Sequence, residues 1–154
     1  MNTAPACYPL TIYYESACPL CRAEMTNLIL RNQAGLLRFE DVSAPGFASP
    51  LPGVSLADLL TLIHARRADG AVVRGVEVLR LAYQVVGLPG VARALRLPGL
   101  RGLAERAYPV LAHNRHRIPR RLVGWLFETG ARRAAERSAR TARCAPDGEC
   151  RLPR

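Results

Sequence analysis

The first part of the chain alternates short apolar runs with one strongly periodic segment, a pattern typical of strands around a helix. Leu10 to Glu15 (LTIYYE) alternates in polarity and is β-branched or aromatic, and so predicts a strand. Apolar residues then recur at helical spacing and predict a helix over Pro19 to Asn32. Proline suits the first helical position, because its missing N–H is not needed there. After Gly35, the segment Leu36 to Val42 predicts a second strand.

The next region is richer in turn residues. Ser43 to Gly53 holds three prolines and two glycines and is therefore predicted to be a loop. Ser55, with Asp58 three residues later, predicts a short helix that begins with an imperfect capping box. Beyond it the pattern predicts a strand over Leu60–Ala65, a turn at Asp69-Gly70, a return strand over Ala71–Arg74 and a helix over Val76–Val86.

The resulting order is β-α-β, short helix, β-hairpin and helix, with a cysteine pair after the first strand. This order is typical of a thioredoxin-like core, so we predict an α/β fold. Beyond Gly87 the pattern is helical throughout and predicts additional C-terminal helices packed on that core. One has an apolar stripe that we expect to face inward: Leu100, Leu103, Ala104, Ala107, Tyr108, Leu111 and Ala112. Another is predicted from about Pro119 to about Arg143, with these residues inward: Leu122, Val123, Leu126, Phe127, Gly130 and Ala134.

The length of the chain predicts a single domain over residues 1–154. Within it we expect a thioredoxin-like core over residues 8–88, a basic helical extension over residues 89–143 and a cysteine-containing tail over residues 144–154. The extension by itself makes too thin a hydrophobic core to stand as a separate domain.

Charge is concentrated in the extension. All 22 basic residues are arginine, and residues 93–143 hold thirteen of them against three glutamates, which accounts for the whole net charge of +10. The densest part, His113 to Arg121, either is a solvated arginine face or binds phosphate, nucleic acid or an acidic protein. It lacks the interleaved aromatic residues of single-strand binders, which disfavours nucleic acid.

The sequence contains no apolar stretch of the length that crosses a membrane and no pattern of a secretory signal. We therefore expect a cytoplasmic protein. In a reducing compartment, its five cysteines indicate redox chemistry or metal binding rather than structural disulfides.

The sharpest chemical signal is Cys18-Pro19-Leu20-Cys21, which opens the predicted helix. If Cys18 caps this helix, its sulfur faces unpaired N–H groups and the positive end of the helix dipole. That position favours the thiolate and makes Cys18 the nucleophile. Cys21, one turn further in, is expected to be less accessible and to resolve the mixed disulfide. The alternatives are half of a zinc site or two core cysteines.

Residues Tyr13 to Cys21 (YYESACPLC) resemble the signature of the DCC family of thiol-disulfide oxidoreductases, usually D-G-x-C-P-x-C. Weaker likenesses follow in order, up to the Asn-Arg-His-Arg run at residues 114–117, and the resemblance covers roughly residues 8–118. It implies a thioredoxin-like fold and thiol–disulfide exchange, without indicating a substrate. Two positions depart from the signature, because Glu15 replaces the usual Asp and Ser16 the usual Gly.

Glu15 lies three residues before the predicted nucleophile. A carboxylate there is a candidate to relay protons during exchange, although its charge also opposes a thiolate. The alternative is an exposed acid at the end of a strand.

Two more cysteines, Cys144 and Cys150, flank the segment Ala-Pro-Asp-Gly-Glu. Its Pro-Asp-Gly favours a turn that can bring the two sulfurs together. They are therefore a second redox pair, the other half of a zinc site, or unconnected tail cysteines.

From these observations we predict a thiol-disulfide oxidoreductase that acts through Cys18 and Cys21, with Glu15 in its catalytic site. Its partners are protein or small-molecule disulfides and thiols, and the reaction requires no organic cofactor and no metal. The alternative is a non-enzymatic zinc-binding or nucleic-acid-binding module that uses Cys18, Cys21, Cys144, Cys150 and the arginine-rich helices.

Overall fold

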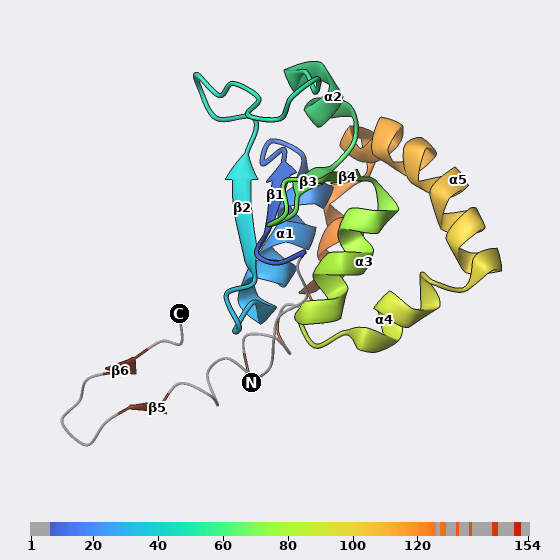
Figure 1. Ribbon diagram of the computed structural model, residues 1–154. Coiled ribbons are helices and arrows are strands. Elements are labelled where there is room, and N and C mark those ends of the chain that lie inside the picture. The colour runs from blue at the N-terminus through green and yellow to red at the C-terminus, as the bar shows by residue number, and fades with distance from the viewer. Residues whose placement is uncertain are drawn as a thin grey trace.

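A computed structural model describes residues 7–125, 127–128, 132, 136, 143–144 and 150–151 of the chain. Its centre is a four-stranded sheet, and helices follow the last strand of this sheet towards the C-terminal half (Figure 1). In the view of Figure 1, α5 is the outermost helix and is joined to α3 through α4.

The strands of the sheet are β1 (Leu10–Tyr14), β2 (Leu37–Asp41), β3 (His64–Arg66) and β4 (Val72–Arg74), in the order β2-β1-β3-β4. β1 and β2 are parallel, because the chain crosses between them through a helix. β3 runs antiparallel to β1 and pairs with β4 as a hairpin. The predicted α/β thioredoxin-like core is thereby confirmed.

Three helices accompany these strands: α1 (Pro19–Arg31), α2 (Leu56–Thr61) and α3 (Val76–Val85). The capping box of α2 is complete, since the Ser55 side chain accepts from the N–H of Asp58 and the Asp58 carboxylate accepts from the N–H of Ser55. The predicted strand from Leu60 is wrong at its start, because Leu60 and Thr61 complete α2 and the strand begins at His64. A well-capped helix here buries Leu59, which favours one more turn over an earlier strand.

Strand β1 is buried on both faces. Leu10 and Ile12, fully buried, pack with α1 and α3 in the main hydrophobic core, whereas Tyr13 packs in a smaller cluster with Leu59. Burial of each large apolar side chain contributes roughly 1.5–3 kcal/mol. The end of this strand is therefore a rigid support for the residues that follow it, which lead to α1.

The C-terminal helices are α4 (Pro89–Ala94), α5 (Pro98–Asn114) and the short 3₁₀ helix η1 (Arg115–Arg117). The apolar stripe of α5 does not face inward as expected: Leu100 and Leu103 are exposed, Leu103 by 65%. The predicted stripe reaches the core only near its C-terminal end, where Ala112 is buried and Tyr108 contacts Gly75 at the start of α3. The helical period is right, but the N-terminal part of the helix projects away from the sheet.

A further helix includes residues 120–125 and 127–128, as predicted from Pro119. Val123 is buried, but Leu122, expected inward, is 47% exposed. The inward positions predicted at Leu126, Gly130 and Ala134 lie outside the described residues. The predicted end at about Arg143 lies outside the described residues, and Arg143 itself belongs to β5 (Arg143–Cys144), which pairs antiparallel with β6 (Cys150–Arg151). Within the part of the chain that is described, no helix is long and apolar enough to cross a bilayer.

Candidate active site

The two cysteines lie at the beginning of α1. Cys18 is the N-cap in an extended conformation and Pro19 is the first helical residue. The N–H of Cys21 donates a hydrogen bond to Cys18 Sγ over 3.3 Å. The sulfur therefore lies against the free N–H groups of the first turn, where the helix dipole stabilises negative charge.

The accessibility of the two cysteines is the reverse of the expected order. Cys18 is fully buried, with 0% of its surface exposed, whereas Cys21 is partly exposed. The turn η1 packs against α1, and the sequence around the cysteines gives no sign of this cover. The Cys18 sulfur lies at the start of α1, but a large substrate has no direct access to it.

A cavity of about 200 Å³ lies beside Cys21, and Glu15, Tyr108 and Arg115 share its lining. Burial raises the pKa of the Cys21 thiol to about 12, and the adjacent Cys18 adds to this shift, while the Arg115 guanidinium acts against it. Cys21 therefore keeps its proton at neutral pH as long as Cys18 is a free thiol or thiolate.

Glu15 is not the exposed acid that the sequence left as an alternative. Its carboxylate Oε2 accepts a hydrogen bond from Arg115 over 2.7 Å, and the two side chains are only 12% and 8% exposed. His116 Nε2 lies 3.3 Å from the same oxygen and is itself exposed to solvent. The guanidinium of Arg115 also donates to the carbonyl oxygen of Leu60. The pair joins the end of β1 to η1.

Arg115, the partner of Glu15, is not singled out by the sequence. It belongs to the Asn-Arg-His-Arg run at residues 114–117, which contributed only to the family resemblance and to the charged surface. No local pattern connects this run to Glu15, because 100 residues separate the two partners.

A second set of polar contacts fixes the loop in front of Cys18. Asp41, at the end of β2, accepts hydrogen bonds from the N–H of Ser16 over 3.1 Å and from its hydroxyl over 2.6 Å. The N–H and hydroxyl of Ser43 donate to the same carboxylate over 3.0 and 2.6 Å. Ser16, where the DCC signature usually has glycine, thus ties the approach to Cys18 to the sheet.

These contacts predict a dependence of stability on acid pH. Burial raises the pKa of the Asp41 carboxyl, but the hydrogen bonds from Ser16 and Ser43 outweigh burial and lower the pKa to about 2. The pKa of an unfolded aspartate is about 3.9. The stability that the Asp41 carboxylate contributes to the fold is therefore fully present above about pH 4 and is lost as the pH falls towards about 2. We expect Asp41→Asn to be less stable at neutral pH and to lose less stability on acidification than the wild type. Urea unfolding midpoints between about pH 5 and pH 2 measure this difference.

Asp69→Asn is the control for that experiment, because Asp69 is an exposed turn residue paired with Arg67. Between about pH 5 and pH 2 this variant should lose as much stability as the wild type does. If Asp41→Asn lost as much stability on acidification as the wild type does, the Asp41 carboxylate would not be the source of the pH dependence.

A buried carboxylate on α1 was also missed. Glu24 accepts a hydrogen bond from the hydroxyl of Tyr83 on α3, and both side chains line the cavity beside Cys21. Burial raises the pKa of the Glu24 carboxyl, and the bond from Tyr83 opposes that shift. A signal was available, because Glu24 shares a helical face with Cys21 and the core residue Leu28.

The remaining sequence candidates are placed as follows. His64, on β3, is buried, and its Nδ1 lies 2.9 Å from the carbonyl oxygen of Leu62. Cys144 and Cys150 are opposite each other across β5 and β6, but their side chains lie outside the described part. Among the side chains that are described, no three His, Cys, Asp or Glu are grouped to hold a metal ion. A zinc site that includes Cys144 and Cys150 is not tested by this result, because the side chains of these two residues are not described.

Comparison with known proteins adds a family. A family model described as DCC1-like thiol-disulfide oxidoreductase matches residues 12–121. An uncharacterized chloroplastic protein of Arabidopsis thaliana is 32% identical over 116 residues, which is 74% of this chain and 54% of that protein. The chain thus spans about half the length of this curated relative. No solved structure matches the chain significantly.

Proposed function

The chain belongs to the DCC1-like thiol-disulfide oxidoreductase family, and on that premise we propose that it exchanges disulfides through Cys18 and Cys21. The observation that carries the proposal is the position of Cys18 as N-cap of α1, with the N–H of Cys21 on its sulfur. A thiolate in that position is a stabilised nucleophile next to a second thiol that can displace it.

In the proposed reaction, the Cys18 thiolate attacks one sulfur of a substrate disulfide. The substrate S–S bond breaks, its second sulfur leaves as a thiolate and takes a proton, and a mixed disulfide forms on Cys18. Cys21 then loses its proton and attacks Cys18 Sγ, which releases the other substrate thiol. Two electrons have passed to the substrate, and an external dithiol restores the Cys18–Cys21 pair.

Glu15 is the proposed acceptor of the Cys21 proton. It shares the cavity with Cys21, and its carboxylate lies 3.3 Å from the solvent-exposed His116, which offers a path for the proton to water. Because Cys18 is buried, exchange with a large substrate also requires η1 to move away from α1. The proposed setting is the reducing cytoplasm, where free thiols persist.

The two cysteines should differ in how their reactivity depends on pH. In a Cys21→Ser variant, we expect Cys18 alkylation to reach its plateau at a lower pH than Cys21 alkylation does in a Cys18→Ser variant. The reason is that both thiols are shielded from water, but only the Cys18 sulfur lies at the N-terminus of α1 and accepts a backbone N–H, whereas burial raises the pKa of the Cys21 thiol. Mass spectrometry after timed alkylation assigns each rate to its cysteine, and the shape of the profile separates ionisation from access. Superimposable profiles would contradict the assignment of Cys18 as the nucleophile.

The tail cysteines are a proposed second redox pair. Cys144 and Cys150 are register partners in the antiparallel pairing of β5 and β6, and facing residues of such strands lie at Cα separations that a disulfide allows. The loop that such a disulfide closes is short and adds little stability. A Cys144→Ser/Cys150→Ser variant should therefore keep its melting temperature within about 2 °C but turn over protein disulfides several-fold more slowly. Unchanged turnover would make the pair a bystander.

Metal content distinguishes this function from a zinc-binding module. Protein purified without oxygen should contain no stoichiometric zinc and should present five titratable thiols when unfolded after reduction. Bound zinc together with protected thiols would favour the non-enzymatic alternative instead.

A further inference from the structure

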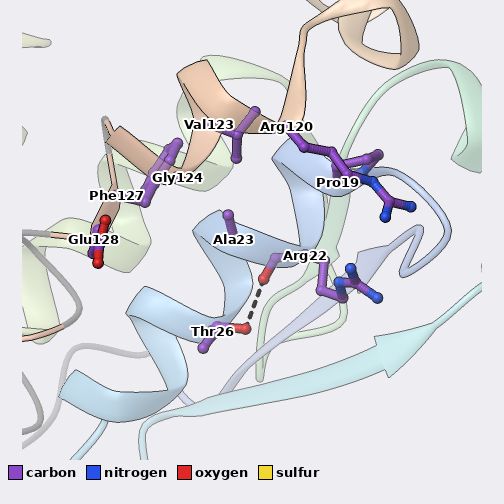
Figure 2. Close-up of a pocket in the computed structure, with 9 residues that line it drawn as sticks. All are labelled: Pro19, Arg22, Ala23, Thr26, Arg120, Val123, Gly124, Phe127 and Glu128. Carbon is purple, nitrogen blue, oxygen red and sulfur yellow. Dashed lines mark hydrogen bonds between the residues drawn. The ribbon is translucent and has the colours of Figure 1, made fainter.

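A groove of about 400 Å³ lies between the first half of α1 and the helical residues 120–125 and 127–128 (Figure 2). We call it the α1 groove. It begins at Pro19, the residue after Cys18, and Ala23, Val123 and Phe127 contribute apolar surface to it. Its volume falls within the roughly 300–1,000 Å³ of ligand pockets. Different residues of α1 line this groove and the cavity beside Cys21, and Phe127 lines both.

The charges of the α1 groove are separated along its length. The guanidinium groups of Arg22 and Arg120 lie near Pro19, and the carboxylate of Glu128 lies at the other end (Figure 2). Both arginines are exposed, and no carboxylate pairs with either of them among the described residues. Two positive groups from different helices therefore converge beside the cysteine pair without any partner in that part of the chain.

We propose that the α1 groove binds a short acidic segment of a protein substrate next to the substrate's disulfide. Carboxylates of the segment pair with Arg22 and Arg120, and its apolar side chains lie on the surface formed by Ala23, Val123 and Phe127. Glu128 repels an acidic residue at the far end, so the segment has a preferred direction. The same carboxylate and the scarcity of aromatic surface disfavour a nucleic-acid strand, which needs continuous positive charge and stacking.

This inference rests on the proposed exchange activity, so its test uses two kinds of substrate. The first is 2-hydroxyethyl disulfide, an uncharged molecule too small to fill the groove. The second is a set of fluorogenic disulfide peptides that differ only in the residues flanking the cysteine: Glu, Ser or Lys. We expect the wild type to have a KM lowest for the Glu peptide and highest for the Lys peptide, because opposite charges favour encounter and binding.

The matched variants are Arg22→Gln/Arg120→Gln and, as control, Arg106→Gln/Arg121→Gln, which removes the same charge from exposed residues that do not line the groove. The first variant should raise KM for the Glu peptide by roughly tenfold, the size expected for two exposed ion pairs, with kcat nearly unchanged. The control should show less than about a twofold change. All four arginines are exposed, so both variants should melt at the wild-type temperature.

The outcomes separate a failure of the docking proposal from a failure of the exchange function. If the wild type reduced none of the disulfides, 2-hydroxyethyl disulfide included, the exchange function itself would be contradicted. Activity without preference between the Glu and Lys peptides would overturn the docking proposal alone, and this comparison needs no variant. If both double variants raised KM for the Glu peptide equally, binding would depend on the overall positive charge of the surface and not on the α1 groove. A single-stranded oligonucleotide that competes with the Glu peptide and binds more tightly, with the same dependence on Arg22 and Arg120, would overturn the proposal in favour of a nucleic-acid surface.

Discussion

Replacing Cys18 with serine is expected to lower the rate of disulfide reduction by roughly 10³-fold or more, to the background of the uncatalysed reaction. A serine hydroxyl at the N-cap keeps the hydrogen bond from the N–H of Cys21, so α1 should still form. The loss then reports the missing thiolate and not a missing helix. Reduction of 2-hydroxyethyl disulfide under a constant thiol supply measures the rate, and circular dichroism checks the fold.

Cys21→Ser should behave differently, because it leaves the attacking thiol in place and removes the resolving one. We expect this variant to accumulate mixed disulfides with substrate that persist through non-reducing electrophoresis and disappear with a reductant. Cys7→Ser is the matched control, since Cys7 is a free cysteine outside the site and should leave turnover unchanged. If Cys21→Ser traps no more substrate than Cys18→Ser does, the order of attack proposed here is wrong.

Replacing Arg115 with methionine is expected to destabilise the fold by about 3–5 kcal/mol, because it leaves the Glu15 carboxylate buried without its guanidinium. The carbonyl oxygen of Leu60 loses a donor as well. Methionine keeps much of the volume of the side chain, so the measured effect comes mainly from charge and hydrogen bonding. Urea unfolding at neutral pH gives the free energy.

The double variant Glu15→Gln/Arg115→Met tests this explanation. Removing both charges should restore most of the stability lost in Arg115→Met, because no unpaired ion then remains in the interior. The exposed pair Arg101–Glu105 on α5 supplies a control: Arg101→Met should cost less than about 1 kcal/mol. A double variant as unstable as Arg115→Met would mean that packing of the guanidinium stem, and not charge pairing, holds η1 in place.

The parts of the fold that the sequence predicts well are those set by neighbouring residues. The alternation in LTIYYE, the proline after Cys18 and the Ser55–Asp58 pair each specify their own element, and the structure has a strand, a helix start and a capping box at these positions. The N-cap position of Cys18 follows from the same local rules. It depends only on the residue types in one turn of helix.

The features that the sequence leaves undetermined depend on where distant segments meet. Cys18 is fully buried, η1 packs against α1, and the partner of Glu15 is 100 residues away. The apolar stripe on α5 shows the same limit for a surface whose packing partner is not encoded locally. Its period gives the helix correctly, yet period alone does not say what covers an apolar face, and Leu103 is exposed.

The bond between Glu15 and Arg115 also has a consequence for the order of events during synthesis. A protein is made from its N-terminus, and early segments begin to fold while later ones are still in the ribosome. All four strands of the sheet, together with Cys18 and Cys21, precede residue 75, so a growing chain can pair the strands well before Arg115 emerges. During that interval α1 lacks its contacts with η1, and Glu15 lacks its counterion. The thiols of Cys18 and Cys21 are therefore without the contacts between η1 and α1 until residues 115–117 have been synthesised.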